Sequence, residues 1–265
     1  MPNFTAKDVQ ALRQLTGAGM MDAKRALEAN DGNSEEAAKW LREQGLGGVA
    51  KRAEREAGEG LVALAVTDSA GAIVELRCET DFVAKSPELV GLAEELAALV
   101  AKSGEQATKE RDSELDNLRT TLKENISIGR VVRMEIGDSS TLGSYLHIQN
   151  QRGVNAVLVE LKGASPEVAH DIALHISFAK PKYISRDEVP EADVAAERAT
   201  VEQIARNEGK PEGAIPKIVE GRMNGFFKDL CLLEQSFVKD EKQTVASLLG
   251  TAEVLRFAQV VVGGT

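Results

Sequence analysis

An internal repeat limits the folds open to this chain more than any other feature of its sequence. Two stretches each combine a first apolar strand, a turn and a second apolar strand: residues 60–64, 69–71 and 73–76, and residues 143–147, 152–153 and 158–161. Each stretch predicts a β-hairpin. A helix beginning Ser-Pro-Glu follows each hairpin, at Ser86 and at Ser165, with Ser at the cap and Pro at the first helical position. We therefore expect a duplicated unit of an antiparallel hairpin and a helix.

The two copies differ in the corner between the second strand and the helix. Residues 77–85 form this corner in the first copy, whereas residues 162–164 form it in the second. The first copy thus carries about six extra residues, which include Glu79-Thr80-Asp81-Phe82-Val83. Connecting segments cannot easily bury their unpaired backbone groups. We expect this insertion to protrude from the fold.

The sequence before the repeat predicts three short helices separated by glycine-containing breaks. Thr5 and Asp8 have the spacing of a capping box at the start of the first helix. The second helix is predicted over residues 22–29, and the third ends at the glycine-rich residues 45–48. This arrangement resembles the ubiquitin-associated type of three-helix domain.

After the repeat, two predicted helices are expected to form an antiparallel hairpin that projects from the body. The first helix, residues 190–208, has a thin apolar seam, and the second has a broader stripe. Facing apolar stripes allow two antiparallel helices to pack together. The seam consists of Val194, Val201 and Ile204, and the stripe of Ile215, Ile218, Val219, Met223, Phe226, Phe227 and Leu230.

The remaining segments complete an α+β fold. A polar helix over residues 110–124 and a strand over residues 131–136 are predicted between the two copies, and a helix over residues 241–249 and a strand over residues 254–262 at the end. The predicted domains are residues 1–50, a ubiquitin-associated-like three-helix domain; 51–59, a linker; 60–140, the N-terminal subdomain of a duplicated core with antiparallel sheets; 141–182 and 230–265, its C-terminal subdomain; and 183–229, an inserted antiparallel helical hairpin of coiled-coil type that is a candidate for dimerisation.

Net charge and hydropathy restrict the partners and the location. The formal net charge of −10 opposes general attraction to phosphate backbones, so no direct nucleic-acid partner is expected. The chain has no run of about 18 apolar residues for a membrane span, and residues 1–5 lack the pattern of a signal peptide. We therefore expect a cytoplasmic protein without a membrane partner, with Cys78 and Cys231 as reduced core residues.

The motifs of common enzymes are missing from the sequence. It contains no Gly-x-x-x-x-Gly-Lys-Ser/Thr phosphate loop, no His-Glu-x-x-His and no paired Cys-x-x-Cys. His170 and His175 are five residues apart, so they do not share a helix face as a zinc pair would. No catalytic, cofactor or metal site is expected. The enzyme alternative, a thiol site built from Cys78, His147 and Asp81, is disfavoured because a cysteine ending an apolar strand is usually packed and unreactive.

Phe82 is the most informative residue of the inserted corner, because aromatic residues make up only 4% of the chain. Its side chain either folds back onto the protein's own core or serves as an apolar anchor that enters a pocket on another protein. The sequence pattern alone leaves both interpretations open.

Three motifs resemble those of the elongation factor Ts family, in the same order and with the same spacing. They are Leu15-Thr16-Gly17-Ala18-Gly19-Met20-Met21-Asp22; Cys78-Glu79-Thr80-Asp81-Phe82-Val83-Ala84-Lys85; and Lys217-Ile218-Val219-Glu220-Gly221-Arg222-Met223-Asn224-Gly225-Phe226-Phe227-Lys228-Asp229 with Leu232-Leu233-Glu234-Gln235 after it. The resemblance covers essentially the whole chain. One departure lies in the second hairpin, where Ala156 stands in place of a glycine that the family usually has.

The resemblance implies a guanine nucleotide exchange factor for the GTPase elongation factor Tu, without bond chemistry of its own. It implies that the corner displaces Mg²⁺ from the partner, with Phe82 as the wedge and Asp81 as the polar group that holds the displaced element or disfavours the phosphate side. The partner-contact residues that it implies are Thr80, Asp81, Phe82 and Val83 at the corner, and Leu12, Met20, Met21 and His147 elsewhere.

Two matters stay open at the level of sequence. The helical hairpin is implied to reach another domain of the partner or a second copy of the factor, which includes a homodimer or a 2:2 complex. A rival hypothesis, based on the first 45 residues alone, is an adaptor that binds ubiquitin-like proteins. That hypothesis leaves the repeat, the inserted corner and the helical hairpin without a role.

Overall fold

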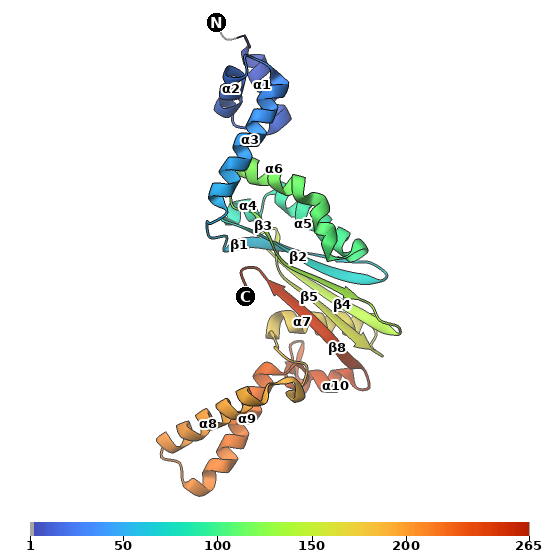
Figure 1. The fold of residues 1–265 in the computed structure, drawn as a ribbon. Helices are drawn as coiled ribbons and strands as arrows, with labels where there is room; N and C mark the ends of the chain where they lie inside the picture. Colours follow the sequence, from blue (N-terminus) through green and yellow to red (C-terminus); the bar gives the residue numbers. More distant parts are fainter. Residues whose placement is uncertain (1–2, 265) are drawn as a thin grey trace.

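The structure is a computed structural model that describes residues 3–264, without the side chains of residues 46–51. It is a mixed fold of helices and antiparallel sheets (Figure 1). The helices are α1 Ala6–Thr16, α2 Met20–Ala29, α3 Ser34–Arg52, α4 Asp81–Ala84, α5 Pro87–Ser103, α6 Asp112–Leu122, α7 Pro166–Ala179, α8 Glu191–Asn207, α9 Ile215–Leu230 and α10 Val245–Leu249. The strands are β1 Glu59–Val66, β2 Ala70–Cys78, β3 Ser127–Glu135, β4 Ser140–Gln149, β5 Arg152–Lys162, β6 Ser236–Phe237, β7 Asp240–Thr244 and β8 Glu253–Val261. The predicted domain boundaries at residues 1 and 265 lie outside the described residues.

The first three helices form a small bundle with its own apolar core. The capping box between Thr5 and Asp8 is present, which confirms the predicted start of α1. Leu12 and Leu27 are fully buried between the helices. The predicted end of the third helix is wrong, because α3 continues past Gly45 to Arg52. Gly45 lies directly against Thr120 of α6, so the bundle rests on the body at this helix.

The first copy of the repeat is an antiparallel sheet in the order β1-β2-β3, covered on one face by α5. Ser86 caps α5 and Pro87 begins it, as the sequence predicts. Leu89, Leu96 and Val100 are fully buried against the sheet.

The second copy is an antiparallel sheet in the order β4-β5-β8, covered on one face by α7. Ser165 caps α7 and Pro166 begins it. The turn between β4 and β5 was predicted near Arg152-Gly153, but it lies at Asn150 and Gln151, with φ of 52° and 66°. Both residues adopt the left-handed conformation that a tight hairpin turn requires, and Arg152 already belongs to β5.

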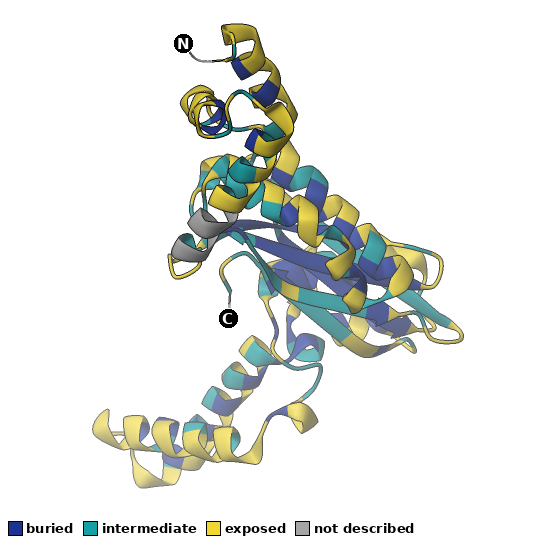
Figure 2. Ribbon diagram, turned by 45° about the horizontal axis from the view of Figure 1, so that its top comes forward, coloured by how far each residue is buried: buried dark blue, intermediate teal, exposed yellow. Residues whose placement is uncertain are grey.

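The two sheets pack face to face, so the body has four layers in the order α5, first sheet, second sheet, α7 (Figure 1). Ile73 of β2, and Ala156 and Leu158 of β5, are fully buried between the sheets. Helices and sheet enclose both faces of these central strands, which explains their nearly continuous apolar sequences. Figure 2 shows the buried residues concentrated in these layers.

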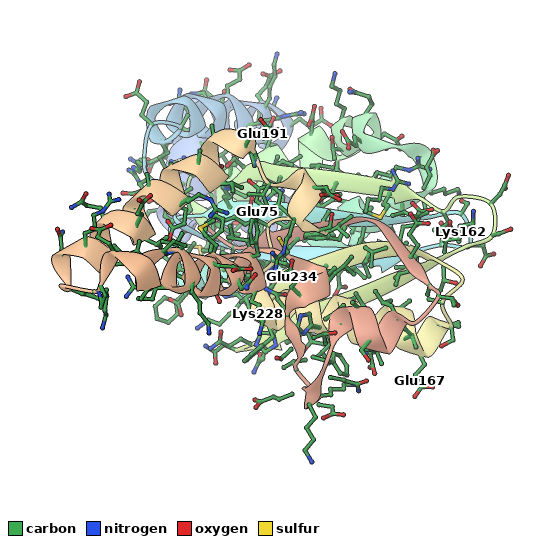
Figure 3. The ribbon with its side chains drawn as sticks, turned by 90° about the horizontal axis from the view of Figure 1, so that it is seen from below. Glu75, Lys162, Glu167, Glu191, Lys228 and Glu234 are labelled. Carbon is green, nitrogen blue, oxygen red and sulfur yellow. The ribbon has the colours of Figure 1, made fainter. Side chains whose placement is uncertain are left out.

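A buried carboxylate ties the end of the chain to the first sheet. Glu75 of β2, labelled in Figure 3, is fully buried. It accepts hydrogen bonds from the backbone N–H groups of Arg130, at 2.9 Å, and Gly263, at 3.2 Å. It also pairs with Arg77 at 3.1 Å. These partners offset the desolvation of the buried carboxylate.

Helices α8 and α9 form an antiparallel pair that extends from the body at the end away from the first bundle (Figure 1). Val201, Val219 and Met223 are buried between them. Ile204, predicted in the seam, is 42% exposed, and its place is taken by the fully buried Ala205.

The segment after α9 differs from the predicted helix over residues 241–249. Only Val245–Leu249 is helical, as α10, and Asp240–Thr244 is strand β7. Thr244 caps α10 by accepting a hydrogen bond from Ser247. Within the described residues, no helix is long and apolar enough to cross a membrane.

Candidate functional site

The inserted corner of the first copy contains a short helix. Strand β2 ends at Cys78, and α4 follows over Asp81–Ala84. Thr80 is the N-cap of α4, because its Oγ1 accepts a hydrogen bond from the backbone N–H of Val83 at 3.3 Å. The corner therefore has one defined turn instead of a free loop.

Phe82 points away from the protein. Its side chain is 78% exposed, while Ala84 in the same helix is fully buried. The ammonium group of Lys85 lies 5.0 Å from the centre of the Phe82 ring, at a cation–π distance. The interpretation in which Phe82 folds back onto its own core is therefore wrong for this structure. An apolar ring held in water on a defined turn is a candidate contact for another molecule.

Asp81 is paired with the residue one helical turn later. Its carboxylate accepts a hydrogen bond from Lys85 Nζ at 2.7 Å. This hydrogen bond is the main cause that lowers the pKa of Asp81, and the positive charge of Arg152 contributes in the same direction. Asp81 is therefore an anion at neutral pH.

Cys78, at the base of the corner, does not have the properties of a catalytic thiol. It is fully buried and free, and its thiol donates to the carbonyl oxygen of Thr80 at 3.2 Å. Burial raises its pKa to about 12. Cys231 is also free and buried, which confirms the prediction of two reduced core cysteines. The enzyme alternative loses its nucleophile, because the thiolate is the reactive form.

A second group of exposed apolar residues lies on the first bundle. Met20 is 47% exposed and Met21 is 64% exposed, both at the start of α2. Leu12, implied as a third contact, is fully buried among α1, α2 and α3. The implied contact of Leu12 is therefore wrong for this structure.

The exposed apolar residue of α1 is instead Leu15, at 73%. Helical periodicity places Leu12 and Leu15 on one face, but the helix ends at Thr16 and Gly17, so Leu15 extends past the bundle core. Its position in the last turn, beside the glycine that ends the helix, is the sequence signal that was missed.

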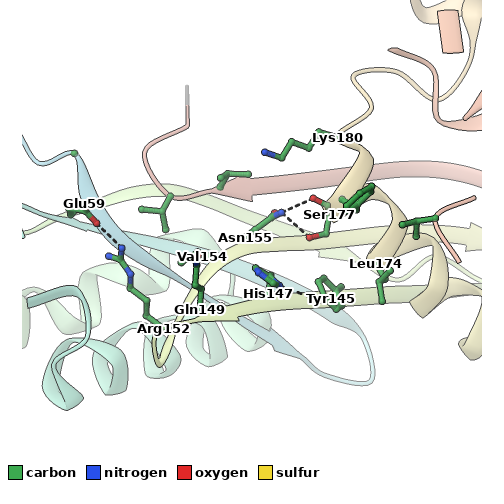
Figure 4. A pocket seen from close by; sticks show the side chains of 15 residues that line it. Glu59, Tyr145, His147, Gln149, Arg152, Val154, Asn155, Leu174, Ser177 and Lys180 are labelled. Atoms are coloured by element: carbon green, nitrogen blue, oxygen red, sulfur yellow. Dashed lines mark hydrogen bonds and ion pairs between the residues drawn. The ribbon is translucent and has the colours of Figure 1, made fainter. Parts of the chain in front are cut away.

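His147 lies on the exposed part of β4 and lines a cavity of about 710 Å³ beside the second sheet (Figure 4). Its Nδ1 is 3.4 Å from the hydroxyl oxygen of Tyr145. Phe178, 75% exposed at the end of α7, lines the same cavity. Sequence reasoning missed Phe178, although an apolar residue beside the helix-ending Ala179 and Lys180 has the same signal as Leu15.

Arg152 joins this cavity to the first sheet. It donates to the carbonyl oxygen of Gly60 at 2.6 Å and pairs with Glu59 at 2.7 Å (Figure 4). Through this residue the start of β1, next to the corner, is fixed to the start of β5. Within residues 3–264, no group of three or more His, Cys, Asp or Glu side chains is arranged to hold a metal ion.

The fold and these surfaces define a class of protein: an α+β protein with a duplicated sheet-and-helix core that presents apolar side chains on fixed turns. A family model described as elongation factor TS matches residues 79–264. Proteins named elongation factor Ts are similar over nearly the whole chain. That of Clavibacter michiganensis is 44% identical and covers 99% of this chain and 100% of its own length. That of Beutenbergia cavernae is 45% identical with 94% of each covered, and that of Mycobacterium bovis is 44% identical with 99% of each covered. The chain belongs to the elongation factor Ts family, a family of translation elongation factors.

Proposed function

We propose that this protein is a guanine nucleotide exchange factor for elongation factor Tu and that it acts by binding, without making or breaking covalent bonds. Membership of the elongation factor Ts family supports the partner and the process. The observation that carries the mechanism is the Phe82 ring, 78% exposed on a capped helical turn.

Phe82 acts as the wedge. GDP in a GTPase is held by backbone amides around its phosphates and by Mg²⁺, so a shift of the segment that presents these groups weakens several contacts together. Burying a phenylalanine side chain contributes about 1.5–3 kcal/mol. One hydrogen bond to a charged group contributes a similar amount, about 1.5–3 kcal/mol. Burial of the ring alone therefore offsets the loss of about one such contact. The other surfaces must supply the binding energy that offsets the loss of the remaining contacts to GDP and Mg²⁺.

The other corner residues have roles that follow from their geometry. Thr80 caps the turn, and Val83 is half-buried against the first sheet, so both keep Phe82 directed outward. Asp81 is anionic and lies beside Phe82. It is suited to hold a displaced N–H group of the partner, or to disfavour the phosphates by charge repulsion.

Two further surfaces supply binding energy that does not depend on the wedge. Met20 and Met21 offer flexible apolar side chains on the first bundle. His147 offers an exposed imidazole beside the cavity of the second sheet. We assign these three residues to the partner interface and leave out Leu12 because it is buried.

Exchange then follows from coupled binding equilibria. If the factor weakens GDP binding by a given ratio, GDP weakens binding of the factor by the same ratio. Incoming GTP expels the factor in the same way, so the cycle needs no energy source beyond the excess of GTP over GDP.

The family resemblance also extends our proposal to the organisation of the chain. We assign residues 1–50 to a ubiquitin-associated-like domain, 51–59 to a linker, 60–140 and 141–182 with 230–265 to the two core subdomains, and 183–229 to a coiled-coil hairpin. The antiparallel packing of α8 on α9 supports the last assignment. The hairpin is proposed to contact another domain of the partner or a second copy of the factor, in the cytoplasm.

The test is the rate of release of a fluorescent GDP analogue from elongation factor Tu, measured by stopped flow. We expect wild-type protein to accelerate release and Phe82→Ala to lower the acceleration about tenfold to a hundredfold, which is the loss of about 1.5–3 kcal/mol of burial. Leu255→Ala is the matched control, because Leu255 is a 40% exposed apolar residue on the distant strand β8. A Phe82→Ala protein with the wild-type rate would refute the wedge.

The adaptor alternative draws no support from the comparisons. An adaptor defined by the three-helix bundle alone would share only that segment with its relatives, whereas the elongation factor Ts of Clavibacter michiganensis matches 99% of the chain.

A further inference from the structure

One carboxylate outside the corner holds the backbone of the corner. Glu124 lies just after the C-cap of α6, in the segment that leads to β3. Its Oε2 accepts hydrogen bonds from the backbone N–H groups of Glu79, at 2.9 Å, and Thr80, at 3.1 Å. Its Oε1 accepts from the hydroxyl of Thr80 at 2.5 Å. Both oxygens of one side chain are therefore used on two consecutive corner residues.

These hydrogen bonds replace the strand pairing that stops at this point. The last residue of β2 in the β1 ladder is Cys78, and the last in the β3 ladder is Arg77. The N–H groups of Glu79 and Thr80 lie beyond both ladders, and a backbone donor needs an acceptor. Glu124 provides that acceptor from a residue 45 positions away from Glu79.

The Thr80 hydroxyl carries this constraint into α4. A hydroxyl has one donor and two acceptor positions. The hydroxyl hydrogen of Thr80 is directed to Glu124. The lone pairs of this hydroxyl therefore remain available to accept from the N–H of Val83, and this hydrogen bond caps α4. The contacts from Glu124 through Thr80 to Val83 thus hold the backbone on both sides of Phe82 in the sequence.

The same short segment also connects to the first bundle. Lys123, the residue before Glu124, pairs with Asp22 of α2 at 3.1 Å. Asn125, the residue after it, donates from its side chain to the carbonyl oxygens of Ala53, at 3.2 Å, and Arg55, at 2.7 Å. Residues 123–125, which we term the junction, therefore touch the corner, helix α2, which carries Met20 and Met21, and the segment after α3.

We infer that Glu124 is a positioning residue for nucleotide exchange, which sets the direction of the Phe82 wedge before the partner arrives. This inference rests on the proposed function. A corner that is ordered in advance does not consume binding energy to become ordered, so more of that energy reaches the displaced nucleotide. Loss of Glu124 is expected to slow the release step at saturating factor, with little effect on the concentration at half-saturation, because the other surfaces still bind.

The decisive comparison is between Glu124→Gln and Glu124→Asp. Glutamine keeps the reach of the side chain, since its amide oxygen can accept both backbone N–H groups while its NH₂ donates to the Thr80 hydroxyl. Aspartate keeps the charge but is one methylene shorter. Positioning therefore predicts a nearly wild-type maximal rate for Glu124→Gln and a rate about tenfold to a hundredfold lower for Glu124→Asp, the size expected for one hydrogen bond to a charged group. Glu114→Ala, which removes an exposed carboxylate of α6 that bonds Ser113, is the matched control.

Release of fluorescent GDP from elongation factor Tu is measured over a range of factor concentrations for each variant. Amide hydrogen exchange at Glu79, Thr80 and Val83 supplies a readout without the partner, and we expect faster exchange in Glu124→Asp than in Glu124→Gln. In a Phe82→Ala background, Glu124→Asp is expected to cause no further loss, because Glu124 acts through the ring.

Three results would overturn the inference. They are a wild-type maximal rate for Glu124→Asp, a slow Glu124→Gln with a fast Glu124→Asp, and losses that multiply in the double variant with Phe82→Ala. Failure of the proposed function has a different signature, since wild-type protein itself would then leave GDP release unchanged.

Discussion

Replacing Gly153 by alanine is expected to force the two sheets apart. Gly153 lies on β5 where the second sheet crosses β1 of the first. A Cβ at this position would lie 2.1 Å from the carbonyl oxygen of Val62 and 2.8 Å from Cδ1 of Leu146, against 3.4 Å or more in an ordinary contact. The obstructing oxygen belongs to the backbone of β1, so it cannot rotate away, and the strands must separate by roughly 1 Å or more.

The cost follows from the interface that this separation opens. Overpacking a core usually costs about 1–3 kcal/mol, and here the movement also loosens the buried contacts of Ile73 and Leu158 between the sheets. We therefore expect a loss near the top of that range, about 3 kcal/mol. For a protein of this size such a loss lowers the melting temperature by roughly 6–12 °C.

Gly71→Ala is the matched control at the same interface. Its added Cβ would lie 2.7 Å from Cδ2 of Leu142 and of Leu158, which are side-chain ends that can rotate away. We expect a loss of about 1 kcal/mol and a melting temperature lower by roughly 2–4 °C. Thermal unfolding followed by circular dichroism measures both variants. A Gly153→Ala protein as stable as wild type, or less damaged than Gly71→Ala, would refute the reasoning.

Two further predictions concern buried titratable groups. Cys78, with its pKa raised to about 12 by burial, is expected to react with a thiol reagent at pH 8 far more slowly in the native protein than in denaturant; equal rates would contradict its packing. Burial lowers the pKa of His175 below its ordinary value of 6.5, so the unfolded chain binds a proton more readily than the folded one. The contribution of neutral His175 to the free energy of unfolding should therefore be fully present above pH 6.5 and decrease as the pH falls below that value. Urea titrations across this range should show the decrease in wild type and not in His175→Gln.

The regular elements of the core were predictable because local signals and global packing agree there. The Ser-Pro-Glu starts of α5 and α7 and the apolar runs of β2 and β5 specify the same structure that the layers require. Residues 241–244 were predicted as helix but belong to strand β7, because its register with β6 depends on pairing rather than on a local pattern.

The glycines show why other boundaries were not predictable. Gly153 was read as a turn residue, whereas it is needed for close approach to Val62. Gly45 was read as a helix end, whereas it lies inside α3 against Thr120. In both cases the reason for the glycine is a neighbour distant in sequence.

The candidate site was only half determined by the sequence. The insertion could be located by comparing the two copies, and the family motif singled out Phe82. In the structure the exposed ring lies on the turn that Thr80 caps, and Glu124 accepts a hydrogen bond from Thr80. No local pattern connects Glu124 to the corner, so the sequence pattern alone could not decide between the two interpretations of Phe82, and only the family resemblance favoured the wedge.

The order of strands in the second sheet has a consequence for synthesis on the ribosome. β5 pairs with β8, and Gly263 reaches back to Glu75 of the first sheet. The first sheet and its helix can form as soon as they emerge, whereas the nascent second sheet keeps an open edge on β5 until β8 has been translated. Chains released early would therefore display that apolar edge, which marks them for chaperones and proteases.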